Sequence, residues 1–163
     1  MDFVLALHSH LPWVLNHGRW PHGSDWLCEA AMDTYLPLLD ELEDLAKEDV
    51  AAPVTIGFTP VLANQLASQE FVTELEDFFA HRLASCDEAE RDLRGRGDGE
   101  LLALVGYWRN RMLRLRERFH QDDCDLVGAF RRLEDDGRLE IMGSAATPGF
   151  LPLLGRDESI RLQ

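Results

Sequence analysis

The chain has 163 residues, enough for one domain with its own hydrophobic core, and 45% of them are hydrophobic. Its 30 acidic and 16 basic residues give a formal net charge of -14, which opposes binding to nucleic acid or to anionic membranes. No apolar run approaches the roughly 18 residues of a membrane-spanning helix, and no signal peptide is recognisable, so we expect no membrane partner.

The first predicted element is a strand that ends in two histidines. An apolar run at 3–7 leads into His8-Ser9-His10 and is stopped by Pro12. Such a run, bounded by a breaker, is typical of a buried strand. Side chains at i and i+2 share one face of a strand, so His8 and His10 should point the same way at its carboxyl end. In parallel α/β proteins, ligands bind at that end.

A loop rich in glycine, proline and aromatic residues follows at 16–23, and a helix follows the loop. Ser24 or Asp25 can cap this helix. Leucines at helical spacing continue it to about 49, and Pro37 is expected to kink or divide it.

A second short strand is predicted at 53–58, and Thr59-Pro60 is a typical helix start. Ser68 can cap a longer helix after this short one. The glycine-rich run 94–99 is expected to form a turn or a mobile loop.

The remaining elements continue the same pattern. A helix over 101–119 should bury Trp108, and Asp122 or Asp123 should cap a further helix that ends at Gly137. A third strand is predicted at 139–143, a loop at 144–152 and one more helix from Asp157. The order predicts an α/β fold with three parallel strands and long helical insertions.

A three-stranded parallel sheet with a helix beginning at its end indicates the N-terminal portion of a larger barrel. We therefore expect residues 1–163 to be part of a catalytic barrel that is truncated before its fourth strand. The alternative is a small, complete three-layer domain.

Three interpretations of the histidine pair stay open. His8 and His10 could be ligands of a metal-dependent hydrolase, but the ends of the second and third strands offer no further ligand. One of them could satisfy a buried backbone group. Both could line a pocket for a polar substrate as hydrogen-bonding groups, which is the interpretation that we favour, and we predict no metal and no cofactor.

Three tryptophans follow the histidines closely. Trp13, Trp20 and Trp26 lie within fourteen residues of one another, and indole faces stack on the C–H faces of sugar rings. The alternative for each is an aromatic corner of the core. No Gly-x-Ser-x-Gly motif is present, and Glu140 precedes the carboxyl end of its strand.

Long motifs, in order, resemble glycoside hydrolase family 57. They are the segments 8–13, 18–30, 34–39, 59–66 and 144–158, which together extend over nearly the whole chain. The most similar subgroup is that of the 1,4-alpha-glucan branching enzymes.

The resemblance implies an incomplete (β/α)7 barrel and a retaining mechanism without metal. A Glu nucleophile and an Asp acid/base, about 5–5.5 Å apart, would act through a covalent glycosyl-enzyme. By the resemblance, His8, His10, Trp20 and Trp26 line the donor site for an alpha-1,4-glucan such as amylose or glycogen. Both catalytic carboxylates are expected beyond Gln163, so we predict no catalytic residue in this chain and no activity of the chain alone.

The sequence departs from the family at Pro148, where a histidine is usual. The loss of this polar group affects the expected substrate subsites. An amylase-like alpha-glucan hydrolase, a metal-dependent hydrolase using His8 and His10, and a non-catalytic glucan-binding remnant remain alternatives to a branching enzyme.

The cysteines and the charge bear on location. Cys28, Cys86 and Cys124 are far apart and form no CxxC pair, which favours a reducing cytoplasm. The single lysine, Lys47, among many carboxylates fits either a salty cytoplasm or a genome that favours Arg codons. Stability measured against KCl distinguishes these two explanations.

Overall fold

The computed structural model describes residues 4–50, 54–147 and 149–163. Its centre is one parallel sheet in the order β1-β2-β3, made of β1 (Leu5–Ser9), β2 (Val54–Phe58) and β3 (Glu140–Met142). The predicted three parallel strands are confirmed, each within its predicted range. Phe3, Pro53 and Pro148, which the sequence analysis singled out or included in strands, lie outside the described residues.

The helices fill the two crossovers between the strands. The first crossover contains α1 (Ser24–Ala30), the π-helical turn η1 (Ala31–Tyr35) and α2 (Leu36–Lys47). The second contains α3 (Pro60–Leu66), α4 (Gln69–Arg96), α5 (Gly99–Gln121) and α6 (Leu126–Asp135). After β3 come the short 3-10 turn η2 (Leu151–Leu153) and α7 (Asp157–Arg161).

Pro37 marks a change of helix type. The chain stays helical from Ser24 to Lys47, but it forms a π-helical turn directly before α2, in which Pro37 occupies the first turn. Proline has no N–H for the preceding turn to bond and is tolerated at a helix start, so the division falls where the ring requires it.

Several predicted helix ends are displaced by tertiary contacts. The α1 cap position is Gly23, because the Ser24 hydroxyl donates to Glu74 on α4 at 2.7 Å and Asp25 pairs with Arg19. Asp125, rather than Asp122 or Asp123, caps α6. Ser68 caps α4 as predicted, accepting from the Phe71 N–H at 3.1 Å.

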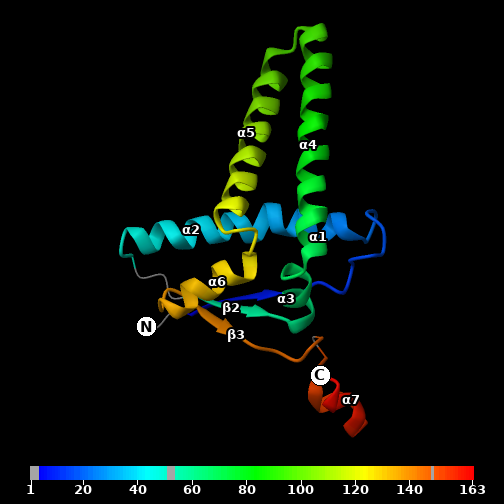
Figure 1. Ribbon diagram of the computed structural model, residues 1–163, viewed down its shortest axis with the longest axis vertical. Coiled ribbons are helices and arrows are strands. Elements are labelled where there is room, and N and C mark those ends of the chain that lie inside the picture. The colour runs from blue at the N-terminus through cyan, green and yellow to red at the C-terminus, as the bar shows by residue number, and fades with distance from the viewer. Residues whose placement is uncertain (1–3, 51–53, 148) are drawn as a thin grey trace.

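The glycine-rich run 94–99, predicted to be a turn or a mobile loop, contains the tight turn of a helical hairpin. Helix α4 continues to Arg96, Gly97 ends it with φ +73°, and Asp98 caps α5. The hairpin of α4 and α5 projects far from the sheet (Figure 1). Trp108 lies on this projection and is 41% exposed, so the prediction that it is a core residue is wrong.

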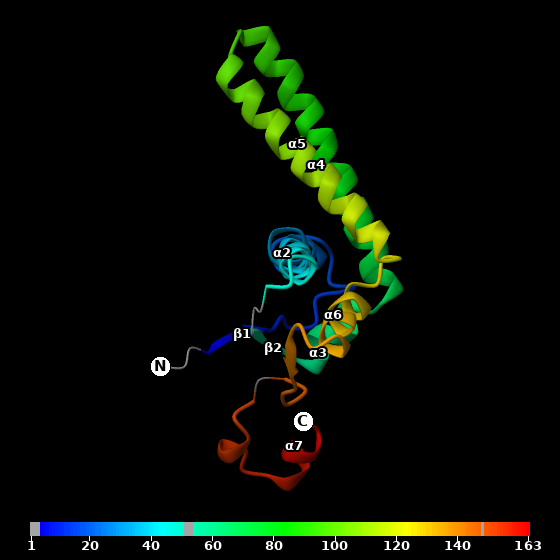
Figure 2. The ribbon, with the colours of Figure 1, turned by 90° about the vertical axis from the view of Figure 1, so that its left-hand side faces the viewer.

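The core lies between the sheet and the helices. Phe71, Phe78, Phe79, Phe119 and Phe130 are fully buried, and Leu7, Ile56 and Ile141 add one face of the sheet to them. In a view along the axis of α2, helix α2 lies above the strands and the segment 143–163 lies below them (Figure 2). The core therefore lies on the face of the sheet that carries Leu7, Ile56 and Ile141.

Candidate functional site at the carboxyl ends of the strands

The strand register places His8 on the sheet face opposite the core. His8 pairs with Gly57 on β2, and Gly57 pairs with Met142 on β3. A Cβ built at Gly57 would lie 3.5 Å from Nδ1 of His8 and 3.5 Å from Cε of Met142. The His8 ring and the Met142 side chain thus approach each other over a glycine, near the carboxyl end of the sheet.

His10 follows β1 directly and is fixed by the neighbouring strand exit. Its Nδ1 atom lies 3.0 Å from the Oγ1 atom of Thr59, in a side-chain hydrogen bond. The Thr59 N–H also donates to the Ser9 carbonyl at 3.2 Å. The two histidines are therefore at one edge of the sheet, as predicted, with His8 exposed and His10 half-buried.

One buried side chain holds the loop that carries Trp13. Gln65 of α3 is fully buried, accepts from the Val14 N–H at 2.7 Å and donates to the Pro12 carbonyl at 3.0 Å. Leu11, Val14 and Leu15 are buried beside it. Gln65 was not predicted from the sequence, although an amide on the apolar side of a short helix was a usable signal.

The neighbours that the structure gives for Trp20 and Trp26 are residues other than His8 and His10. Trp20 is 81% exposed and lines a polar hollow of about 570 Å³ with Arg19, His81 and Arg82. Trp26 packs against the His22 ring, with ring centroids 5.8 Å apart. Within the described ranges, no hydrogen bond or ring contact joins either tryptophan to His8 or His10.

The hollow beside Trp20 is bordered by ion pairs. Arg19 pairs with Asp25 at 3.0 Å, and Arg82 pairs with Glu29 at 2.6 Å and lies over the Phe78 ring at 4.7 Å from its centroid. The pairs offer donors and acceptors together with little net charge. Such a surface suits a neutral ligand with many hydroxyl groups better than it suits an ion.

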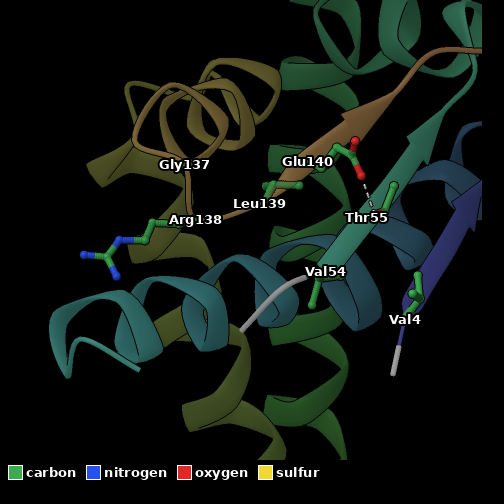
Figure 3. Close-up of a pocket in the computed structure, with 7 residues that line it drawn as sticks. All are labelled: Val4, Val54, Thr55, Gly137, Arg138, Leu139 and Glu140. Carbon is green, nitrogen blue, oxygen red and sulfur yellow. Dashed lines mark hydrogen bonds between the residues drawn. The ribbon is translucent and has the colours of Figure 1, made fainter. Parts of the chain in front are cut away.

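A second hollow lies at the opposite end of the strands. It has a volume of about 380 Å³ and is bordered by residues that include Val4, Val54 and Arg138 (Figure 3). In this hollow the Thr55 hydroxyl donates to Glu140 at 2.6 Å, across β2 and β3. In barrel folds the amino ends of the strands serve stability and the carboxyl ends carry the active site, so we place the candidate site at the histidine end.

The described residues offer neither a metal cluster nor an activated thiol. No group of three or more His, Cys, Asp or Glu side chains in these ranges is placed to hold a metal ion. Burial, followed by Glu74 and Asp25, raises the pKa of Cys28 to about 12, and burial also raises the pKa of Cys124. Raised thiol pKa values oppose the thiolate that a nucleophile requires.

Comparisons with known proteins identify the family of this chain. The sequence model of the family Glycosyl hydrolase family 57 matches residues 4–163. The chain is 40% identical over 161 residues to a 1,4-alpha-glucan branching enzyme of Thermococcus kodakarensis, covering 98% of this chain and 23% of that protein. It thus spans about a quarter of the length of that relative.

Solved structures give the same result for the fold. The crystal structure of a branching enzyme of this family from Pyrococcus horikoshii matches with a TM-score of 0.90 and 39% identity, over 96% of this chain and 29% of that one. An alpha-amylase from Thermotoga maritima matches with a TM-score of 0.81 over 92% of this chain and 28% of that one. Its identity of 24% shows a shared fold alone.

Proposed function

Because the chain belongs to glycosyl hydrolase family 57, we propose that it forms part of the catalytic domain of an alpha-glucan branching enzyme. The observation that carries the proposal is the 40% identity to a branching enzyme across 98% of the chain. We place the domain in an incomplete (β/α)7 barrel, of which these three strands are the first.

In the proposed reaction, a glucan is cleaved with retention and transferred to a 6-hydroxyl of another chain. The family mechanism needs two carboxyl groups about 5–5.5 Å apart. We expect both in the remainder of the barrel, which is then the necessary partner of this chain. The described residues would contribute one wall of the donor site, with His8 and His10 as hydrogen-bonding groups and Trp20 and Trp26 as stacking surfaces.

The proposed reaction has a substrate and a cellular location that we also propose. Glycogen or a similar alpha-glucan is the proposed substrate, and the cytoplasm is the proposed location, in agreement with three free cysteines. Within the described ranges, no helix is both long and apolar enough to cross a membrane.

The reading frame beyond codon 163 provides the test. Sequencing it should reveal a fourth strand that bears a Glu shortly after Gln163, and an Asp much later. The complete product, incubated with amylose, should introduce branches that isoamylase removes. Absence of the fourth-strand Glu would contradict the proposal.

An amylase-like hydrolase is the alternative that the shared fold supports. The two activities differ in their products. A hydrolase generates new reducing ends without isoamylase-sensitive branches, whereas a branching enzyme generates branches with few new reducing ends. Measuring both products in one incubation decides between them.

A further inference from the structure

Thr59 occupies an unusual place for a helix-capping residue. It precedes Pro60 at the start of α3 and is fully buried, yet its hydroxyl accepts no hydrogen bond from the first turn of the helix. A threonine at this position ordinarily caps the helix with its side chain. Here the hydroxyl is turned to Nδ1 of His10 instead, at 3.0 Å.

The hydrogen-bond requirements of this hydroxyl fix the direction of the bond. A buried O–H needs an acceptor, because leaving the donor unpaired is costly. Among the described residues, Nδ1 of His10 is the partner that the Thr59 hydroxyl has. If Nδ1 carried the proton, the Thr59 hydrogen would have no acceptor there. The bond is therefore satisfied when Thr59 donates and Nδ1 accepts.

We propose that Thr59 is a positioning residue that holds His10 as the neutral tautomer with its proton on Nε2. Since the two ring nitrogens are linked, a hydrogen bond accepted at Nδ1 leaves Nε2–H as a donor. This donor suits an oxygen atom of a sugar hydroxyl. The inference rests on the proposed glucan site for its ligand, whereas the tautomer rests on the contact with Thr59.

The backbone on both sides of His10 is held as well. The Thr59 N–H donates to the carbonyl of Ser9, and Gln65 bonds Pro12 and Val14 on the other side. The backbone around His10 is thus held by Thr59 at the start of α3 and by Gln65 on the buried face of α3. A fixed donor loses little conformational freedom when a ligand binds.

Nitrogen NMR of the histidines tests the tautomer directly in the 163-residue chain. The chain has six histidines, and the signal that is missing in the His10→Gln variant identifies that of His10. In the wild type, we expect a protonated Nε2 and an unprotonated Nδ1 for His10. Thr59→Val, which replaces the hydroxyl by a methyl group, should abolish this preference, and Thr59→Ser should restore it. Thr73→Val, which removes an exposed hydroxyl on α4, is the control and should change nothing.

Ligand binding gives an independent readout. Thr59→Val should weaken maltoheptaose binding about tenfold, the equivalent of one hydrogen bond, and Thr59→Ser should recover it. Circular dichroism melting verifies that each variant is folded. A proton on Nδ1 in the wild type, or an unchanged tautomer in folded Thr59→Val, overturns the inference. If the tautomer shifts as expected but the wild type binds no maltoheptaose, the proposed glucan site fails while the role of Thr59 stands.

Discussion

Gln65 holds the loop that follows His10 and carries Trp13. Its amide bonds the Val14 N–H and the Pro12 carbonyl from a fully buried position. Gln65→Leu should lower the free energy of unfolding by about 1–3 kcal/mol, because the Val14 N–H then stays buried without a partner. Urea denaturation measures the change. Gln69→Leu, an exposed change on α4, is the control, and equal effects of both variants would contradict the role of Gln65.

The buried thiol of Cys28 should lower the free energy of unfolding at alkaline pH. Burial is the main cause that raises the pKa of its thiol from 9.0 to about 12. Above about pH 9 the unfolded chain loses this proton while the folded chain keeps it, so the stability that is present below pH 9 is lost as pH rises toward 12. The free energy of unfolding of Cys28→Ala should therefore decline less steeply with pH than that of the wild type.

Ile56→Val is the control for Cys28→Ala, since it truncates a buried side chain that has no ionisable group. It should keep the wild-type pH dependence. Chemical denaturation at several pH values between about 8 and 10.5 gives the slopes. Identical slopes for Cys28→Ala and the wild type would show that the buried thiol does not contribute.

At the scale of elements, Arg118 links α5 to α2 and also pairs with Asp122 at the carboxyl end of α5 itself. Its guanidinium pairs with Asp40 at 2.7 Å and with Asp122 at 2.8 Å, and it also contacts Glu43. Asp122 is buried and pairs with Arg132 as well. Arg118→Met should cost about 3 kcal/mol of stability, because it removes one of the two cations that pair with the buried Asp122 carboxylate.

The exposed pair of Lys47 and Asp44 provides the comparison for Arg118. Both of its side chains are largely in solvent, where an ion pair contributes little. Lys47→Met should leave the urea midpoint nearly unchanged. A similarly small effect of Arg118→Met would mean that the network does not hold the helices together.

The sequence predicted the elements well where local chemistry determines them. The apolar runs of the three strands, Pro60 after Thr59, and the Ser68 cap all follow from residue type and spacing. Other features depend on partners far along the chain. The Ser24 hydroxyl bonds Glu74 instead of capping α1, and the Thr59 hydroxyl bonds His10 instead of capping α3. No local pattern contains these contacts.

The candidate site was predicted in part. The strand spacing correctly indicated that His8 and His10 lie at one edge of the sheet. Trp20 lines a hollow that α4 also borders, and its place in a donor site with the histidines stays a prediction. Trp108 fits the apolar spacing of its helix, yet the hairpin projects and leaves it exposed. The roles of His8, His10, Trp20 and Trp26 in sugar binding stay predictions.

At the scale of the whole molecule, the sheet has open edges. Within the described residues, β1 and β3 each pair with a strand on one side only. Phe150, Leu153 and Leu162 are also strongly exposed. Open edges and exposed apolar side chains favour association, so light scattering should show a mass that rises with concentration. A monomer that melts cooperatively would contradict this expectation.

We propose that residues 1–163 form one wall of the catalytic site of a branching enzyme. A chimera tests it most directly: residues 1–163 replace the matching segment of the Thermococcus kodakarensis enzyme, to which they are 40% identical. The purified, folded chimera should introduce isoamylase-sensitive branches into amylose, and His10→Gln in the chimera should reduce the rate. A folded chimera that forms no branches, beside an active parent enzyme, would contradict it.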